Sequence, residues 1–133
     1  MQTIQISFTR EMVHSWPDCP AGGKYSFLRF PHSHKFRITV ELEVREADRE
    51  VEFYALRDLA ADELRVLDES GRLEFASCEE MAQLLRARLL GHFPWRWLKV
   101  SVFEDGDFGA SEDGVGAPAG RFGSGQRGGP GRL

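Results

Sequence analysis

The fold is decided by the stretch from residue 32 to residue 45, which has the sequence HSHKFRITVELEVR. From residue 35 onward apolar and polar side chains alternate strictly, which is the period-2 pattern of a strand with one face in a core. The apolar positions are Phe36, Ile38, Val40, Leu42 and Val44. The positions between them are charged or polar, so the pattern predicts one long strand whose other face meets water.

Two shorter stretches repeat this alternation on either side of the long strand. Residues 3–12 carry Ile4, Ile6 and Phe8 at every second position, and residues 97–103 carry a similar apolar set. Residues 15–33 are rich in turn formers and predict a loop between the first two strands. A second strand near the C-terminus is not evident.

The middle of the chain predicts two helices. Apolar residues recur at threes and fours over residues 53–67, which is typical of an amphipathic helix. Ser77 and Glu80 form a capping-box pattern ahead of a second apolar stripe that ends at Gly91. The order strand, strand, helix, helix, strand predicts an α+β fold with an antiparallel sheet.

Composition divides the 133 residues into two parts. An apolar content of 41% with 29% charged residues is typical of a soluble globular protein. Ten of the 14 glycines lie in residues 106–133, so we expect a folded domain over residues 1–105 and a flexible Gly-rich tail over residues 106–133. The net charge of −4 argues against nucleic acid as a partner.

Cysteine usage and hydropathy indicate the compartment. Cys19 and Cys78 are too few for a disulfide framework, and the start of the chain lacks the pattern of a signal peptide. No apolar run approaches the roughly 20 residues of a membrane helix. We therefore expect a cytoplasmic protein with no membrane partner.

Three of the four histidines fall where the first two strands meet the loop. His32 and His34 are two residues apart and face the same way in a strand, and His14 ends the neighbouring strand. Three imidazoles are a known way to hold a catalytic zinc ion with one position open. Ordinary surface or capping histidines are the alternative interpretation of the same pattern.

The spacing of His14 from His32-Ser33-His34 resembles the zinc site of the 6-pyruvoyl-tetrahydropterin synthase and 6-carboxy-tetrahydropterin synthase family. Four further segments are similar to motifs of that family and occur in the same order: Val51–Leu56, Leu67–Asp68, Ala76–Glu79 and Val102–Glu104. The resemblance covers about 100 residues. It implies a tunnelling-fold (T-fold) ββααβ(β) unit, with two helices on one face of the sheet, that assembles into trimers or hexamers with sites between subunits.

The resemblance also implies a chemistry. Zn²⁺ held by His14, His32 and His34 would bind the side chain of a dihydropterin triphosphate for carbon–oxygen lyase chemistry, and Glu104 would hold the amino-pyrimidine edge of the pterin. Asp68 matches the family's proton-relay aspartate.

Two proton-handling positions depart from the family pattern. Leu28 occupies the position of the family's general-base cysteine, and Glu69 that of the histidine after the aspartate. Glu69 as a carboxylate base, or Cys19 on a folded-back loop, are the candidate replacements. Cys78 opens the second helix, where a helix dipole favours thiolate, although a small residue near a cap is the plainer interpretation. The alternative function is a catalytically degenerate T-fold protein that binds a pterin or purine without turnover.

Overall fold

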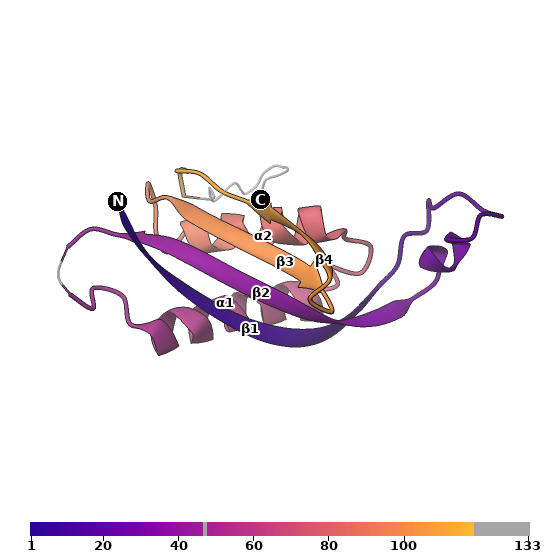
Figure 1. Ribbon diagram of the computed structural model, residues 1–133, viewed down its shortest axis with the longest axis horizontal. Helices are drawn as coiled ribbons and strands as arrows, with labels where there is room; N and C mark the ends of the chain where they lie inside the picture. The colour runs from indigo at the N-terminus through magenta and orange to yellow at the C-terminus, as the bar shows by residue number, and fades with distance from the viewer. Residues whose placement is uncertain (47, 119–133) are drawn as a thin grey trace.

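The computed structural model describes residues 1–46 and 48–118, which form a four-stranded antiparallel sheet with two helices (Figure 1). The elements are β1 (Gln2–His14), the 3₁₀ turn η1 (Ser26–Arg29), β2 (His32–Val44), α1 (Phe53–Glu69), α2 (Cys78–Leu90), β3 (Leu98–Glu104) and β4 (Phe108–Glu112). Strand order follows chain order, and both helices lie on the same face of the sheet. The predicted α+β class with an antiparallel sheet is confirmed, and the predicted order ββααβ is followed by a further strand, β4, that the sequence did not indicate.

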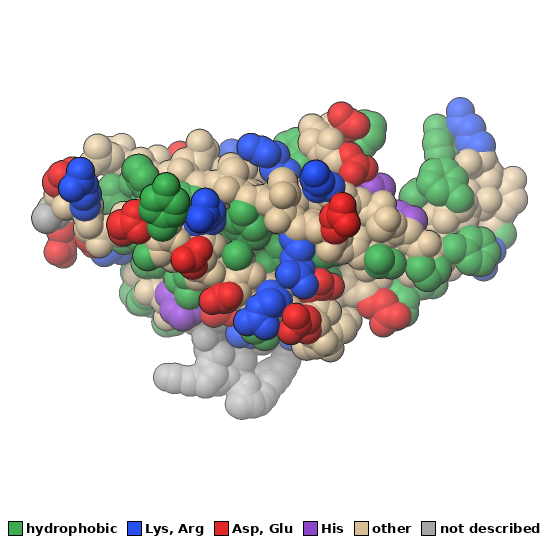
Figure 2. All heavy atoms as spheres, turned by 90° about the horizontal axis from the view of Figure 1, so that it is seen from below, with side chains coloured by type: hydrophobic (Ala, Val, Ile, Leu, Met, Phe, Trp, Pro, Cys, Tyr) green, Lys and Arg blue, Asp and Glu red, His purple; other side chains and the backbone are tan. Residues whose placement is uncertain are grey.

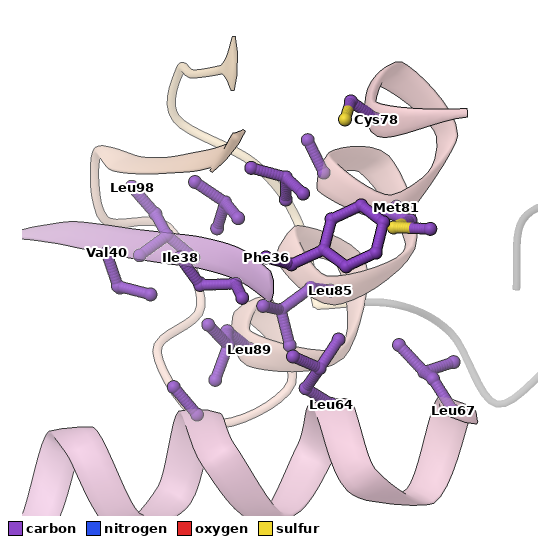
Figure 3. Close-up of a cluster of buried hydrophobic side chains, with 14 of the residues drawn as sticks. Phe36, Ile38, Val40, Leu64, Leu67, Cys78, Met81, Leu85, Leu89 and Leu98 are labelled. Carbon is purple, nitrogen blue, oxygen red and sulfur yellow. The ribbon is translucent and has the colours of Figure 1, made fainter. Parts of the chain in front are cut away.

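The alternation in β2 builds the core. β1 and β2 pair along their whole length, from Gln2 opposite Val44 to His14 opposite His32. The apolar residues of β2 from Phe36 to Leu42, and those of β3 from Leu98 to Val102, are fully buried against the apolar stripes of the two helices (Figure 3). Burial of a continuous apolar face is the main favourable term in folding such a unit.

Both helices begin at side chains that cap them. The Glu52 carboxylate accepts a hydrogen bond from the Ala55 amide at 3.1 Å, and the Ser77 hydroxyl accepts one from the Glu80 amide at 3.1 Å. Ser77 is the cap that the sequence predicted, and it sets the point where α2 starts. None of the helices in the described part of the chain is long and apolar enough to cross a membrane.

The predicted tail boundary at residue 106 is wrong, because β4 extends the sheet beyond it. Asp105 and Gly106 have φ of 53° and 79°, and such left-handed residues make a tight turn after β3. Gly109 then pairs with Phe103, and Val115 bridges to Trp97. Gly106 serves a turn and Gly109 a close strand contact, so the glycine content of this segment does not indicate flexibility. The rest of the expected tail, residues 119–133, lies outside the described residues.

The loop between β1 and β2 extends away from the body of the molecule (Figure 1). Histidine side chains are visible where this loop leaves the body, and acidic and basic side chains are interspersed over the face shown (Figure 2). The base of the loop is therefore the place where the predicted histidine cluster meets solvent.

Candidate metal centre

Strand pairing brings the three predicted histidines together. His14 is the last residue of β1 and lies directly opposite His32, the first residue of β2. His34 follows two residues later on the same face, and the next residue of that face is the core residue Phe36. The imidazoles of His32 and His34 therefore continue the core-facing row of β2 to the end of the sheet, and His14 lies beside them on β1.

The three rings are close enough to share one ion. One ring nitrogen from each histidine lies within 4.8 Å of the corresponding nitrogen of the other two. The ring centroids are 4.6 Å apart for His14 and His32, 5.0 Å for His32 and His34, and 5.4 Å for His14 and His34. His14 is only 8% exposed, so its ring faces the other imidazoles rather than bulk water.

Hydrogen bonds fix the tautomer of each ring. Nδ1 of His14 donates to the carbonyl of Ala76 at 2.8 Å, and Nδ1 of His32 donates to the carbonyl of Phe30 at 2.8 Å. Nδ1 of His34 donates to the Asp105 carboxylate at 2.7 Å. Because a carbonyl oxygen only accepts, the proton of a neutral ring sits on Nδ1 and leaves a lone pair on Nε2. Histidines that hold metals are oriented by partners of this kind.

Two of these Nε2 atoms have no hydrogen-bond partner among the residues that the structure describes. They belong to His14 and His34, and both are buried. Burial lowers the pKa of His14 below 6.5, with smaller lowering contributions from the two other imidazoles. The His14 ring is therefore neutral at pH 7, and its buried lone pair lacks a proton. Buried lone pairs that converge without a donor fit a metal cation, so the residues present suit a metal site.

Glu104 lies beside the histidines. Its Oε2 is 3.3 Å from Nε2 of His14, and its Oε1 is 3.7 Å from Nε2 of His34. The residue ends β3 and is the register partner of Phe36, which places it on the same core-facing side. The sequence predicted Glu104 as a substrate-binding residue, and the structure places its carboxylate at the edge of the histidine cluster.

A cavity of about 500 Å³ opens over this cluster. Polar groups from His14, His32 and Glu104 form one part of its wall. The remaining wall includes Trp16 and Leu28 from the loop, Phe75–Glu79 around the start of α2, and Phe108–Ala110 from β4. Cavities of about 300–1,000 Å³ with apolar walls and few polar groups are typical small-molecule sites.

The thiol in this cavity belongs to Cys78. Burial and the neighbouring Glu104 carboxylate raise the pKa of Cys78 to about 12. Cys78 is therefore a neutral thiol at pH 7 despite its position at the start of α2. Leu28, which stands where the resemblance expects a cysteine, also lines the cavity.

The three predicted catalytic residues lie apart from this cavity within the described chain. Asp68 is paired with Arg10 at 2.8 Å and lines a separate cavity of about 330 Å³, whose wall also includes His14. Glu69 is exposed and paired with Arg65 at 3.1 Å. Cys19 is buried in the loop, where its thiol donates to the Tyr25 carbonyl at 3.6 Å. Their catalytic roles stay predictions.

Sequence reasoning missed Asp105. Its carboxylate accepts from His34 and from the Lys35 amide, which orients His34 from outside the cluster. The hydrogen bond from His34 lowers the pKa of Asp105, so the residue is a carboxylate at neutral pH. The available signal was Asp105-Gly106, a dipeptide typical of tight turns.

Comparisons with known proteins do not identify the family. No protein-family model matches the chain, and no curated protein matches it either. The resemblance to the tetrahydropterin synthases therefore stays a prediction.

Proposed function

We propose that this chain is a zinc-dependent T-fold protein of the 6-pyruvoyl/6-carboxy-tetrahydropterin synthase type, with carbon–oxygen lyase activity on a dihydropterin triphosphate. The observation that carries the proposal is the convergence of three imidazoles, each oriented through Nδ1, beside the 500 Å³ cavity. A set of three neutral imidazoles is a zinc-binding arrangement found in catalytic sites.

Each group in the cavity has a role in this proposal. Zinc at the three histidines would supply Lewis acidity to the hydroxyls of the substrate side chain. The Glu104 carboxylate accepts hydrogen bonds from the amino-pyrimidine edge. The rings of Trp16, Phe75 and Phe108 offer flat apolar surfaces for the pterin.

Assembly belongs to the same proposal. In the described part of the chain β1 pairs only with β2, and β4 pairs only with β3, so the sheet has two open edges. Long unpaired edges promote association with other strands. Closure into a trimer or a hexamer would cover these edges and bring Asp68 of a neighbouring subunit near the cavity. Light scattering on the purified protein measures the assembly directly, and a zinc-bound monomer at micromolar concentration would contradict this part.

Metal content tests the centre of the proposal. Purified protein should contain about one zinc ion per chain, and His34→Ala should lose it. His92→Ala is the matched control, because His92 pairs with Glu63 at 2.8 Å on another part of the surface. Equal metal content in wild type, His34→Ala and His92→Ala would refute a zinc site at the three histidines.

A second function is favoured by two residues of the cavity. Leu28 cannot transfer a proton, and Cys78 is a neutral thiol with a raised pKa. These residues suit a protein that binds a pterin or purine without turnover. Incubation with dihydroneopterin triphosphate distinguishes the two functions, because a binder would quench the tryptophan fluorescence and release no triphosphate.

A further inference from the structure

The backbone fixes where the Glu104 side chain can reach. Glu104 is the last residue of β3 and pairs with Phe36, two residues after His34 on the same face of the sheet. The Glu104 side chain is about a quarter exposed, with 26% of its surface open. Strand register therefore holds this carboxylate next to the imidazoles, as it holds the imidazoles next to one another.

The Glu104 carboxylate lies close to two of the three histidines, at distances near those between ligands of one metal ion. Ligands about 2.0–2.1 Å from a tetrahedral zinc ion are about 3.3–3.4 Å from one another. The carboxylate oxygens of Glu104 lie 3.3 Å and 3.7 Å from the Nε2 atoms of His14 and His34. Neither Nε2 atom has a hydrogen-bond partner among the described residues, so these contacts are not hydrogen bonds.

The charges of these groups also favour a cation between Glu104 and the histidines. A carboxylate is repelled by imidazole lone pairs that face it, and a cation placed between them removes that repulsion. Both nitrogens are buried, and burial in a low-dielectric surrounding strengthens this repulsion. A divalent ion would turn three mutually repelling groups into three ligands.

We propose that Glu104 is a fourth protein ligand of the metal, so that a set of three imidazoles and one carboxylate closes the site when no substrate is bound. This inference rests on the proposed function only for the metal at the three histidines. Catalytic zinc sites usually keep a position open for water or substrate. Here the Glu104 carboxylate would take that position, and it would have to leave the metal before a substrate could bind there.

The test uses the full chain, stripped of metal and titrated with Zn²⁺ and with Co²⁺. Zinc affinity is measured by competition with a chelator, and the visible spectrum of Co²⁺ gives the coordination. Glu104→Gln should weaken zinc binding at least tenfold, which corresponds to about 1.4 kcal/mol. Glu104→Ala should change the cobalt spectrum, and added acetate should restore it. Glu79→Gln is the matched control, since Glu79 lines the same cavity and should leave both readouts unchanged.

The outcomes separate this inference from the proposed function. Unchanged zinc affinity in Glu104→Gln, together with an unchanged cobalt spectrum in Glu104→Ala, would overturn Glu104 as a ligand and leave the three-histidine site intact. Absence of zinc binding in the wild type would refute both. Cooperative thermal unfolding of each variant shows that a weakened affinity does not come from loss of the fold.

Discussion

Gly109→Ala tests whether β4 belongs to the folded domain. A Cβ atom at this position would lie 2.3 Å from the carbonyl oxygen of Val102 and 2.6 Å from Cγ of Phe103. Both distances are much shorter than van der Waals contact. Because the Val102 oxygen belongs to the backbone of the paired strand β3, β4 would have to move to make room for the Cβ atom. Forcing extra volume into a packed region costs about 1–3 kcal/mol. In a flexible tail the same change would be neutral or would stabilise by about 0.4–1 kcal/mol through the unfolded chain.

A paired β4 predicts that Gly109→Ala lowers the free energy of unfolding, whereas a flexible tail predicts no change or an increase. Urea unfolding therefore distinguishes the two structures. With a urea dependence of about 2 kcal/mol per molar, a loss of about 2 kcal/mol lowers the unfolding midpoint by about 1 M. Gly23→Ala is the matched control, because an added Cβ there meets nothing within 4 Å and φ is not positive. A midpoint for Gly109→Ala equal to or above that of Gly23→Ala would refute the pairing of β4 with β3.

Three further predictions concern the metal, the thiol and the surface charges. Free zinc at 100 times its dissociation constant should add about 2.7 kcal/mol to the free energy of unfolding. Because 1 kcal/mol corresponds to about 4–8 °C in Tm, removal of the zinc with a chelator should lower Tm by roughly 10–20 °C in a thermal melt. An unchanged Tm would show that no metal is linked to folding. Because its pKa is raised to about 12, the Cys78 thiol should react slowly with iodoacetamide at pH 8. Glu104→Gln should speed this reaction, since it removes the neighbouring negative charge. Mass spectrometry measures both rates, and rapid alkylation of the wild type would contradict the raised pKa. Hydrogen bonds from Arg45 and Arg96 lower the pKa values of Glu43 and Glu50, respectively, from 4.5 to about 2. The two carboxylates therefore contribute fully to stability above pH 4.5, and this contribution is lost as the pH falls toward 2. Arg96→Gln should flatten the dependence of stability on pH in urea titrations at pH 2–5, and an unchanged dependence would exclude Arg96 as a cause of it.

The elements that sequence predicts best are those whose signal is local. Alternation over residues 36–44 predicts β2 because side chains of a half-buried strand must alternate, whatever the strand pairs with. Ser77 predicts the start of α2 because a capping hydroxyl needs only an amide three residues later. The same periodicity places His32 and His34 on one face, and only the position of His14 required a pairing between strands.

The parts that sequence could not supply depend on contacts between distant residues. Gly109 lies in β4 because Phe103 and Val102 leave no room for a Cβ, and composition alone cannot distinguish such a glycine from a linker glycine. The hydrogen bond between His34 and Asp105 joins residues 71 positions apart, so no spacing rule predicts it. The proximity of Glu104 to His14 likewise follows from the register of three strands.

The projecting loop between β1 and β2 has a consequence for how this protein can diverge. The histidines end the flanking strands, whereas the cavity wall takes Trp16 and Leu28 from the loop itself. Insertions or substitutions along the loop can therefore reshape what enters the cavity while the imidazoles keep their positions. Loops tolerate such changes far better than paired strands do. Selection can thus change ligand preference in this chain without rebuilding the histidine cluster.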